Sequence, residues 1–400
     1  MDMLKLAGVF ACMIVILRLK KPLYVAAIAC TLLTIVLFGF TPQLAATTLG
    51  AALVRAKSWR VIAIIYMMSL LQVMMNSRKM FETARSALVG LSNRLRVNVA
   101  VIPIFMGILP TPGSVLIAAP MIDEDCKEYL TKDEKTFITS FYRHIPETWL
   151  PTYSSVILAL ELSGVPVAQY MLYMLPVVFM MLAVPYVIYL RKLPKTTGID
   201  MSENKARELG RLFKGLWSIL LLIFMILVLE ISVQTSTLVV LVLLAVAGKF
   251  SFGELAGQAK EAVNMKMLIS TYTVLIFSSV LGAAGVMERL PATFESLPIP
   301  AWLTFALLFF FGSIVGGVDA IVVMVLPLAF ATVPNAGAPL LMLLMTFGHM
   351  AMQLTPIHIC LTLASEFFGT TLQSLMARTL PVAAVVAGFA SLFYLLLTLF

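Results

Sequence analysis

The stretch IPIFMGILPTPGSVLIAAPMI, residues 102–122, is an apolar run that breaks at its centre. Residues 102–109 are apolar, residues 110–113 interrupt the run, and residues 114–122 are apolar again. Each arm has roughly ten residues, whereas a helix needs about 20 to cross the ~30 Å core of a bilayer. Two such arms predict a re-entrant helical hairpin whose tip reaches the middle of a membrane. The alternative is a single kinked helix that spans the membrane.

A second broken run occupies the matching place in the carboxy-terminal half, where Gly316-Gly317-Val318-Asp319 separates apolar residues 303–315 from 320–328. A shift of 205 positions superposes the two halves without a gap. The matches include His, Glu, Gly and Pro, which apolar segments use sparingly. They are Gly107/Gly312, His144/His349, Pro151/Pro356, Glu161/Glu366, Gly164/Gly369, Met171/Met376, Pro176/Pro381 and Tyr189/Tyr394. Such a duplication is typical of secondary transporters.

The composition indicates an integral membrane protein. Of the 400 residues 61% are hydrophobic and 12% charged, whereas soluble proteins have about 25% charged residues. The net charge of +8 does not imply a nucleic-acid partner, because the basic residues lie in short loops beside apolar runs. The four cysteines show no paired spacing and are expected to be small buried residues. No small-residue cleavage site follows residues 6–17, so we interpret this stretch as retained and not as a signal peptide.

Each half contains six apolar runs, of which the fourth and fifth are interrupted. If the fourth is a hairpin, each half crosses the membrane five times, and this odd number turns the second half upside down. The sequence therefore predicts an all-α polytopic membrane protein with two inverted-topology repeats, about ten transmembrane helices, two re-entrant helical hairpins and two broken helices. The predicted boundaries are residues 1–195 for the first repeat, 196–213 for a cytoplasmic linker, 214–400 for the second repeat, 98–121 and 301–328 for the hairpins, and 138–163 and 338–366 for the broken helices.

The distribution of positive charge supports the hairpins. With the amino terminus outside, 22 of the 28 lysines and arginines fall in loops on the cytoplasmic side, and Arg143 falls in a membrane segment. Full spans in place of the hairpins would move the basic residues of 191–214 outside. The expected location is the inner (plasma) membrane, with multiple passes through the lipid bilayer and both termini outside. Residues 77–97 are basic and loosely amphipathic, which predicts a surface helix on the cytoplasmic face.

The hairpin tips are the first candidate binding sites. A helix that starts at the midplane exposes backbone N–H groups that attract a carboxylate, and one that ends there exposes carbonyl groups that attract a cation. Glycine allows a ligand to approach the backbone, and proline leaves carbonyl acceptors unpaired. The alternative is that these glycines serve close helix packing. The predicted substrate-binding residues at the tips are Thr111, Pro112, Gly113, Ser114, Gly316, Gly317 and Val318.

The fifth runs supply the remaining candidates, because all three histidines lie there and both runs contain prolines at which a helix would unwind. Imidazole exchanges protons near neutral pH, although each histidine could instead pack between helices. The predicted substrate contacts are Thr148, Thr355, Pro356 and His358. The predicted ion-coupling residues are Asp319, Glu147, His358, His144 and His349, with a candidate sodium site near Thr111 and Asp319. Glu161 and Glu366 are expected to form caps or salt bridges near the membrane surfaces.

Four motifs carry a resemblance to a known family: GILPTPGS (residues 107–114), AAPMID (118–123), QLTPIHICL (353–361) and EFF (366–368). They resemble the ion transporter superfamily, and more narrowly its ten-span family called domain of unknown function four hundred and one. The resemblance covers nearly the whole chain. The superfamily includes permeases for gluconate, citrate and C4-dicarboxylates. The resemblance implies a mobile transport domain of hairpins and broken helices, an elevator mechanism driven by protons or sodium, and a homodimer. The tips lack the Ser-Asn-Thr pattern of the sodium–dicarboxylate branch.

The predicted function is therefore ion-coupled secondary transport of a small organic anion by elevator-type alternating access. The coupling ion is a proton or sodium, and no other cofactor is expected. Enzymatic activity is not predicted, since the chain has no phosphate-binding glycine loop, no His-Glu-x-x-His zinc motif and no Gly-x-Ser-x-Gly elbow. The alternatives are a passive anion channel and a non-transporting membrane scaffold. Polar residues that cluster at mid-depth favour a gated site over a channel.

Overall fold

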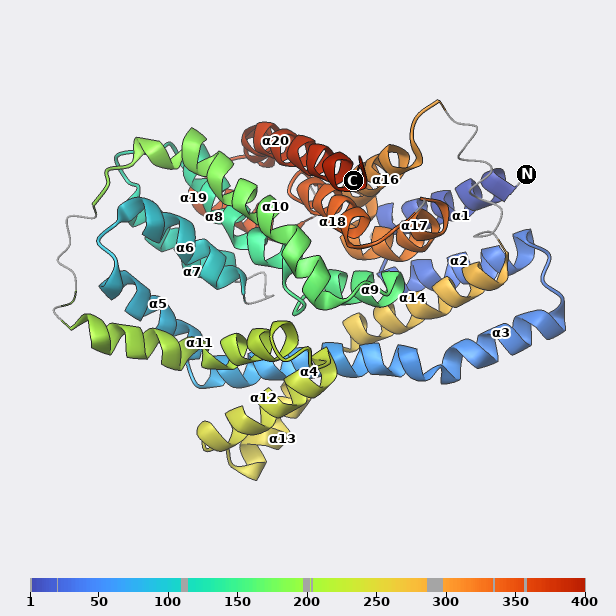
Figure 1. Ribbon diagram of the computed structural model, residues 1–400, viewed down its shortest axis with the longest axis horizontal. Helices are drawn as coiled ribbons and strands as arrows, with labels where there is room; N and C mark the ends of the chain where they lie inside the picture. Colours follow the sequence, from blue (N-terminus) through green and yellow to red (C-terminus); the bar gives the residue numbers. More distant parts are fainter. Residues whose placement is uncertain are drawn as a thin grey trace.

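The computed structural model describes residues 2–19, 21–108, 114–196, 202, 204–285, 298–333, 335–355 and 358–399. This part of the chain consists of helices joined by short loops and contains no strand (Figure 1). Five of its helical segments are long and apolar enough to cross a membrane, and several shorter helices are also apolar. The predicted all-α polytopic class is confirmed.

Most helices of the first half overlap the apolar runs of the sequence. The helices of this half are α1 (Asp2–Arg18), α2 (Leu23–Leu37), α3 (Pro42–Val54), α4 (Ala56–Ser77), α5 (Met80–Leu91), α6 (Leu95–Gly107), α7 (Ser114–Asp125), α8 (Lys132–Trp149), α9 (Ser154–Ser163), α10 (Val167–Ile188) and the short 3-10 helix η1 (Leu190–Lys192). Those of the second half are α11 (Lys205–Leu227), α12 (Val233–Ala247), α13 (Phe252–Glu261), α14 (Met265–Ala283), α16 (Ala301–Gly316), α17 (Val318–Thr332), α18 (Ala338–Met352), α19 (Ile359–Phe368) and α20 (Leu372–Leu399).

The break between α16 and α17 reverses the chain. Gly317 adopts a φ of +81°, a conformation that favours glycine. Gly312 and Ile321 lie on opposite sides of this break and are in contact, since a Cβ atom on Gly312 would lie 2.5 Å from Ile321 Cδ1. In a continuous helix, nine positions correspond to about 13 Å along the axis. The segment is therefore a hairpin and not a kinked helix, and its entry into a membrane stays a prediction.

The two halves pack against each other in a reciprocal pattern. Helix α2 packs on α14, and its counterpart α12 packs on α4. Helix α3 likewise contacts α14 while α13 contacts α4, and α7 contacts α19 while α17 contacts α9. A duplication whose copies are related by a two-fold axis gives this exchange of partners. The inverted orientation of the repeats in a membrane stays a prediction.

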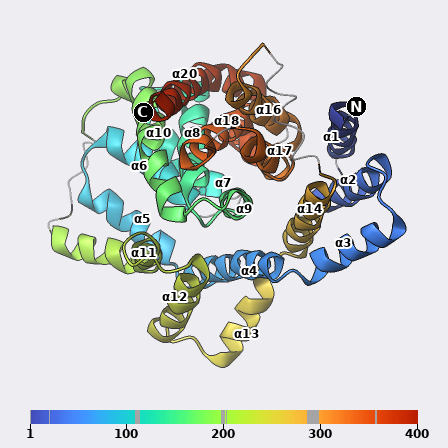
Figure 2. The same ribbon diagram turned by 45° about the vertical axis from the view of Figure 1, so that its right-hand side comes forward.

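The helices form two groups, which Figure 2 separates clearly. The site group contains α6–α10 and α16–α20, and the frame group contains α1–α5 and α11–α14. The two groups meet where α4 and α14 contact α9 and α17, and also between α1 and α16, α5 and α6, and α10 and α11. Helices α12 and α13 project from the frame group on the side away from the site group.

Helices α3 and α13 were not predicted, because the sequence was divided by apolar runs alone. Their start signals are nevertheless present. The Thr41 hydroxyl caps α3 just before Pro42, and Ser251 and Glu254 form a capping box at α13. Helix α11 begins at Lys205, inside the predicted linker. Helix α5 lies within the predicted surface segment 77–97 and packs on α11.

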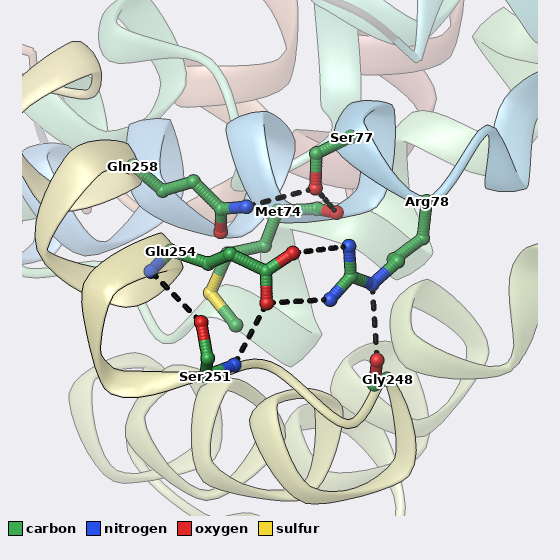
Figure 3. Close-up of polar contacts among 7 residues, drawn as sticks. All are labelled: Met74, Ser77, Arg78, Gly248, Ser251, Glu254 and Gln258. Atoms are coloured by element: carbon green, nitrogen blue, oxygen red, sulfur yellow. Dashed lines mark hydrogen bonds and ion pairs between the residues drawn. The ribbon is translucent and has the colours of Figure 1, made fainter.

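Figure 3 shows how the projecting pair of helices, α12 and α13, is attached at the end of α4. The Arg78 guanidinium donates hydrogen bonds of 3.0 and 3.1 Å to the two carboxylate oxygens of Glu254, and a third of 3.0 Å to the Gly248 carbonyl. Gln258 donates a hydrogen bond to the Ser77 hydroxyl at 3.0 Å. The bonds from Arg78 lower the pKa of the exposed Glu254 carboxyl to about 2.

This pair should give a small, pH-dependent stabilisation. A carboxyl whose pKa is lowered on folding contributes stability above its unfolded pKa and loses it as the pH falls through the folded value. We expect Glu254→Gln to lower the melting temperature at pH 7 by about 1–2 °C, since exposed ion pairs contribute little. The difference should shrink from pH 5 towards pH 2 in thermal melts of the detergent-solubilised protein, with Glu82→Gln as the control. A difference that is equally large at pH 2 would contradict this account.

Candidate functional site

Two adjoining cavities lie between the site group and the frame group. The larger, of about 410 Å³, is lined by Arg143, Glu147, Tyr153 and His358 on one side and by Met68 and Gln72 of α4 on the other. The smaller, of about 250 Å³, is lined by Asp319 of α17 and by Ser270 and Thr271 of α14. Ser154, Asn264 and Met267 line both and join them. We call them the Ser154 cavities, and their combined size suits a small ligand.

Breaks in two helices bring polar groups to this place. Helix α8 ends at Trp149, Leu150 and Pro151 follow, and α9 starts only at Ser154. Proline offers no backbone N–H to continue the helix, so the chain turns here, and Tyr153 and Ser154 line the larger cavity. Helix α18 ends at Met352, and α19 starts after His358. Because α19 packs on α8, His358 and Cys360 lie against the polar residues of α8.

Arg143 and Glu147 form a buried ion pair on α8. The Arg143 Nη1 atom lies 3.5 Å from Glu147 Oε2, and the two residues share one helix face because they are four positions apart. Arg143 is only 2% exposed, yet it lines the larger cavity. Arg143 was predicted only to lie in a membrane segment. Its position in an apolar run could have identified it as a site residue, since an arginine at membrane depth usually faces a cavity and a functional partner.

His144 and His358 meet edge to face beside this ion pair. Their Nε2 atoms are 2.9 Å apart and their ring centroids 4.8 Å apart. The other ring nitrogen of His144, Nδ1, lies 2.6 Å from the Ser140 carbonyl oxygen. His144 Nε2 is also 4.0 Å from Glu147 Oε2. His358 lines the larger cavity, and His144 lies behind it in the protein interior.

Asp319 lies at the first turn of α17, in the smaller cavity. The Ser154 hydroxyl lies 3.3 and 3.5 Å from its two carboxylate oxygens and can donate its single proton to only one of them at a time. The amino-terminal end of a helix stabilises a carboxylate through its unpaired N–H groups. Lys266 lines the same cavity from α14 and is exposed. Asp319 is thus joined through Ser154 to the cavity that contains Arg143.

Three other predicted site residues lie close to backbone carbonyl oxygens and do not line the cavities. The Thr148 hydroxyl donates to the Ile145 carbonyl at 2.7 Å, and the Thr355 hydroxyl to the Ile314 carbonyl at 2.6 Å. His349 is buried in α18 with Nδ1 2.8 Å from the Met345 carbonyl oxygen. None of these three lines the Ser154 cavities.

The predicted tip residues divide into two sets. Gly316, Gly317 and Val318 form the turn of the second hairpin, beside Asp319. Ser114 is the first residue of α7. The remaining predicted residues lie outside the part of the chain that the structure describes: Thr111, Pro112, Gly113 and Pro356. Of the predicted residues, the structure therefore brings Glu147, His144, His358 and Asp319 together.

Gly107 positions the Arg143 segment. A Cβ atom on Gly107 would lie 1.9 Å from the Arg143 carbonyl oxygen, so α6 and α8 approach too closely for any side chain. The Tyr153 hydroxyl donates a hydrogen bond to the Gly107 carbonyl. One glycine thus fixes both the ion-pair helix and the break that follows it. Gly312, at the equivalent position of the second half, meets a side chain, that of Ile321.

Gly107→Ala should therefore destabilise the protein by about 1–3 kcal/mol, because the added methyl group must push α6 from the α8 backbone. We expect a lower melting temperature and impaired activity, measured by thermal unfolding in detergent and by transport after reconstitution. Gly388→Ala is the matched control, since a Cβ atom on Gly388 of α20 meets nothing within 4 Å. Equal melting temperatures for the two variants would contradict the assigned packing.

A further cavity, of about 490 Å³, lies at the far ends of the same helices. It is lined by Arg55, Glu161 and Ser279, among others, and Arg55 Nη1 donates a hydrogen bond to the Ser279 hydroxyl at 3.2 Å. Helices α9 and α17 start at the Ser154 cavities and end at this Arg55 cavity, which Leu162 and Phe330 also line. The boundary between the two groups is therefore hollow at both ends of α9 and α17.

Comparison with known proteins places the chain in a family and gives a likeness in fold. The crystal structure of the Alcanivorax borkumensis YdaH transporter is similar, with a TM-score of 0.56 at 13% sequence identity over 88% of this chain and 86% of that chain. At this identity the likeness shows the fold alone, which is that of a transporter. No curated protein matches the sequence. The wider relation to the ion transporter superfamily stays a prediction. The family model described as "Protein of unknown function (DUF401)" matches residues 3–397, so the chain belongs to this family, as the ten-span motifs predicted.

Proposed function

We propose that the protein is an ion-coupled secondary transporter that binds a small organic anion in the Ser154 cavities. The observation that carries this proposal is the Arg143 guanidinium, which is 2% exposed and lines a cavity between two groups of apolar helices. Guanidinium is planar and pairs with a carboxylate through two parallel hydrogen bonds. A charged group at membrane depth is retained only where it has a partner or a task. A carboxylate-bearing substrate gives Arg143 that task.

Glu147 supplies a way to couple the anion to a cation. Its oxygen lies 3.5 Å from Arg143 Nη1, which is longer than the roughly 2.7–2.9 Å of a strong charged hydrogen bond. A substrate carboxylate on Arg143 would replace Glu147 and leave it as an unpaired buried anion. Glu147 then gains a proton or another cation, so that anion and cation bind together. Asp319, held by Ser154, is the second acceptor for a coupling ion, either a proton or sodium.

Alternating access fits the arrangement of the two groups. Arg143, Glu147 and Asp319 all belong to the site group, while exposed Glu261 and Lys266 of the frame group lie at the cavity mouths. With the predicted orientation, the Ser154 cavities open to the cytoplasm and the Arg55 cavity opens outside. An elevator-like shift of the site group along α4 and α14 would carry the substrate from one side to the other. The anion therefore would travel with its own binding residues.

The test is transport by the protein reconstituted in liposomes. Small mono- and dicarboxylates are added with a proton gradient, a sodium gradient or neither, and uptake and solid-supported-membrane currents are recorded. We expect uphill accumulation of one anion class with one of the two gradients. Uptake that stops at equilibrium would indicate a passive anion channel instead. No uptake and no substrate-dependent change in melting temperature would favour a non-transporting scaffold.

The placement in the cell is part of the same proposal. The protein would lie in the inner (plasma) membrane with both termini outside, and the family resemblance suggests a homodimer. Alkaline phosphatase fused to the carboxy terminus should be active, because the enzyme folds only outside the cytoplasm; an inactive but stable fusion would reverse the orientation. Light scattering of the purified protein measures the oligomeric state.

A further inference from the structure

Three potential metal ligands lie together at the wall of the larger cavity. They are His144, His358 and Cys360, each of which offers one ligand atom, and these atoms all lie within 4.8 Å of one another. The two imidazole nitrogens are 2.9 Å apart. A tetrahedral zinc ion, with bonds of about 2.0–2.3 Å, would separate such atoms by about 3.3–3.5 Å. Shifts of about 1 Å would therefore convert the cluster into three sides of a zinc tetrahedron.

The surroundings of His144 suit a ligand. Its Nδ1 atom lies 2.6 Å from the Ser140 carbonyl oxygen, which can only accept a hydrogen bond, so Nδ1 carries the proton. The Nε2 lone pair then points towards His358 and Cys360. A metal-bound histidine usually donates its other N–H to a backbone carbonyl or a carboxylate, which fixes its ring. Without metal, His358 Nε2–H donates to this lone pair.

We propose that His144, His358 and Cys360 form a binding site for zinc or a similar thiophilic divalent ion. Two imidazoles and a thiolate favour such ions and disfavour magnesium and calcium, which prefer oxygen ligands. Binding releases the thiol proton of Cys360 and moves the His358 proton from Nε2 to Nδ1. A fourth ligand is available, because Glu147 Oε2 lies 4.0 Å from His144 Nε2. The thiolate and the Glu147 carboxylate together balance the charge of the ion.

Metal bound at this site would regulate transport and would not itself take part in it. The site connects α8 with the residues at the start of α19, and it lies in the wall that also contains Arg143 and Glu147. A metal that binds Glu147 would prevent this carboxylate from taking up the coupling ion when a substrate replaces it at Arg143. Micromolar zinc should then inhibit the reconstituted protein. The binding itself does not depend on the proposed transport function, so the two can fail separately.

The direct test uses spectroscopy of the purified, reduced protein in detergent. Cadmium should produce a thiolate-to-metal charge-transfer band that saturates at one ion per chain, and cobalt should give the visible bands of a tetrahedral site. Cys360→Ser should remove the thiolate band. It should also weaken binding by more than the roughly 10- to 100-fold that the loss of an outer hydrogen-bond partner causes. Cys360→His should restore cobalt binding without the thiolate band, which separates loss of a ligand from loss of the fold.

The control is Cys30→Ser, which changes a buried cysteine that lies outside the cluster and donates to the Val9 carbonyl at 3.4 Å. This variant should keep the band of the unmodified protein. A band that survives in Cys360→Ser but disappears in Cys30→Ser would overturn the assignment. The absence of any saturable band in the unmodified protein would overturn it as well. Gel filtration of each variant shows that it is folded.

Discussion

Replacing Arg143 with glutamine should abolish transport of the anion, with a loss on the order of 100-fold or more. Removing one partner of a buried charge pair costs about 2–5 kcal/mol, which corresponds to a factor of about 30 to several thousand. Two effects add here. The substrate carboxylate loses its guanidinium partner, and Glu147 stays buried without the charge that lies 3.5 Å away. Uptake by reconstituted protein measures the loss once a substrate has been found.

Three further variants separate binding from folding. Arg143→Lys keeps the charge but loses the planar fork, so we expect weak transport with a raised KM. The double variant Arg143→Gln with Glu147→Gln removes both charges, which should restore stability but not activity. Arg78→Gln is the matched control, because it breaks an ion pair of similar chemistry outside the Ser154 cavities. Transport at the normal rate by folded Arg143→Gln would eliminate the proposed anion site.

Local signals explain what the sequence could predict. Pro151 predicted the break in α8–α9, and Gly316-Gly317 predicted the turn of the second hairpin, because these residues limit the backbone wherever they occur. Glu147 and Asp319 were predicted because a carboxylate in an apolar run needs a partner. The family was predicted from short motifs in the first broken run and in the second broken helix. All these signals lie within a few residues of the feature they predict.

The remaining features depend on segments that are far apart in the chain. Nothing near Ser154 indicates that its hydroxyl meets Asp319, 165 positions away. The walls that α4 and α14 contribute have no motif of their own. Thr148 does not line the Ser154 cavities for a local reason, since a hydroxyl within a helix readily bonds the carbonyl three or four residues earlier. Sequence thus indicated which residues were unusual, and packing decided which of them share a cavity.

The second large effect should appear in Asp319→Asn, as loss of coupling. The amide keeps the shape of the carboxylate and can still bond to Ser154, but it has no charge to hold a sodium ion and does not take up a proton. We expect the apparent affinity for the coupling ion to fall at least about 10-fold, the effect of about 1.4 kcal/mol. Uphill accumulation should fall towards equilibrium, while exchange of labelled for unlabelled substrate, which needs no net coupling, should continue.

Ser154→Ala is the matched control for this variant. It removes one hydrogen bond from Asp319 and keeps the charge, so a loss of only about 5-fold is expected from a bond of roughly 1 kcal/mol. Coupled accumulation that survives in Asp319→Asn would leave Glu147 as the sole acceptor of the coupling ion. In that case Glu147→Gln must uncouple transport by itself, because the Ser154 cavities offer no other carboxylate of the site group among the residues that the structure describes. The pair of variants therefore assigns the coupling ion to one carboxylate or the other.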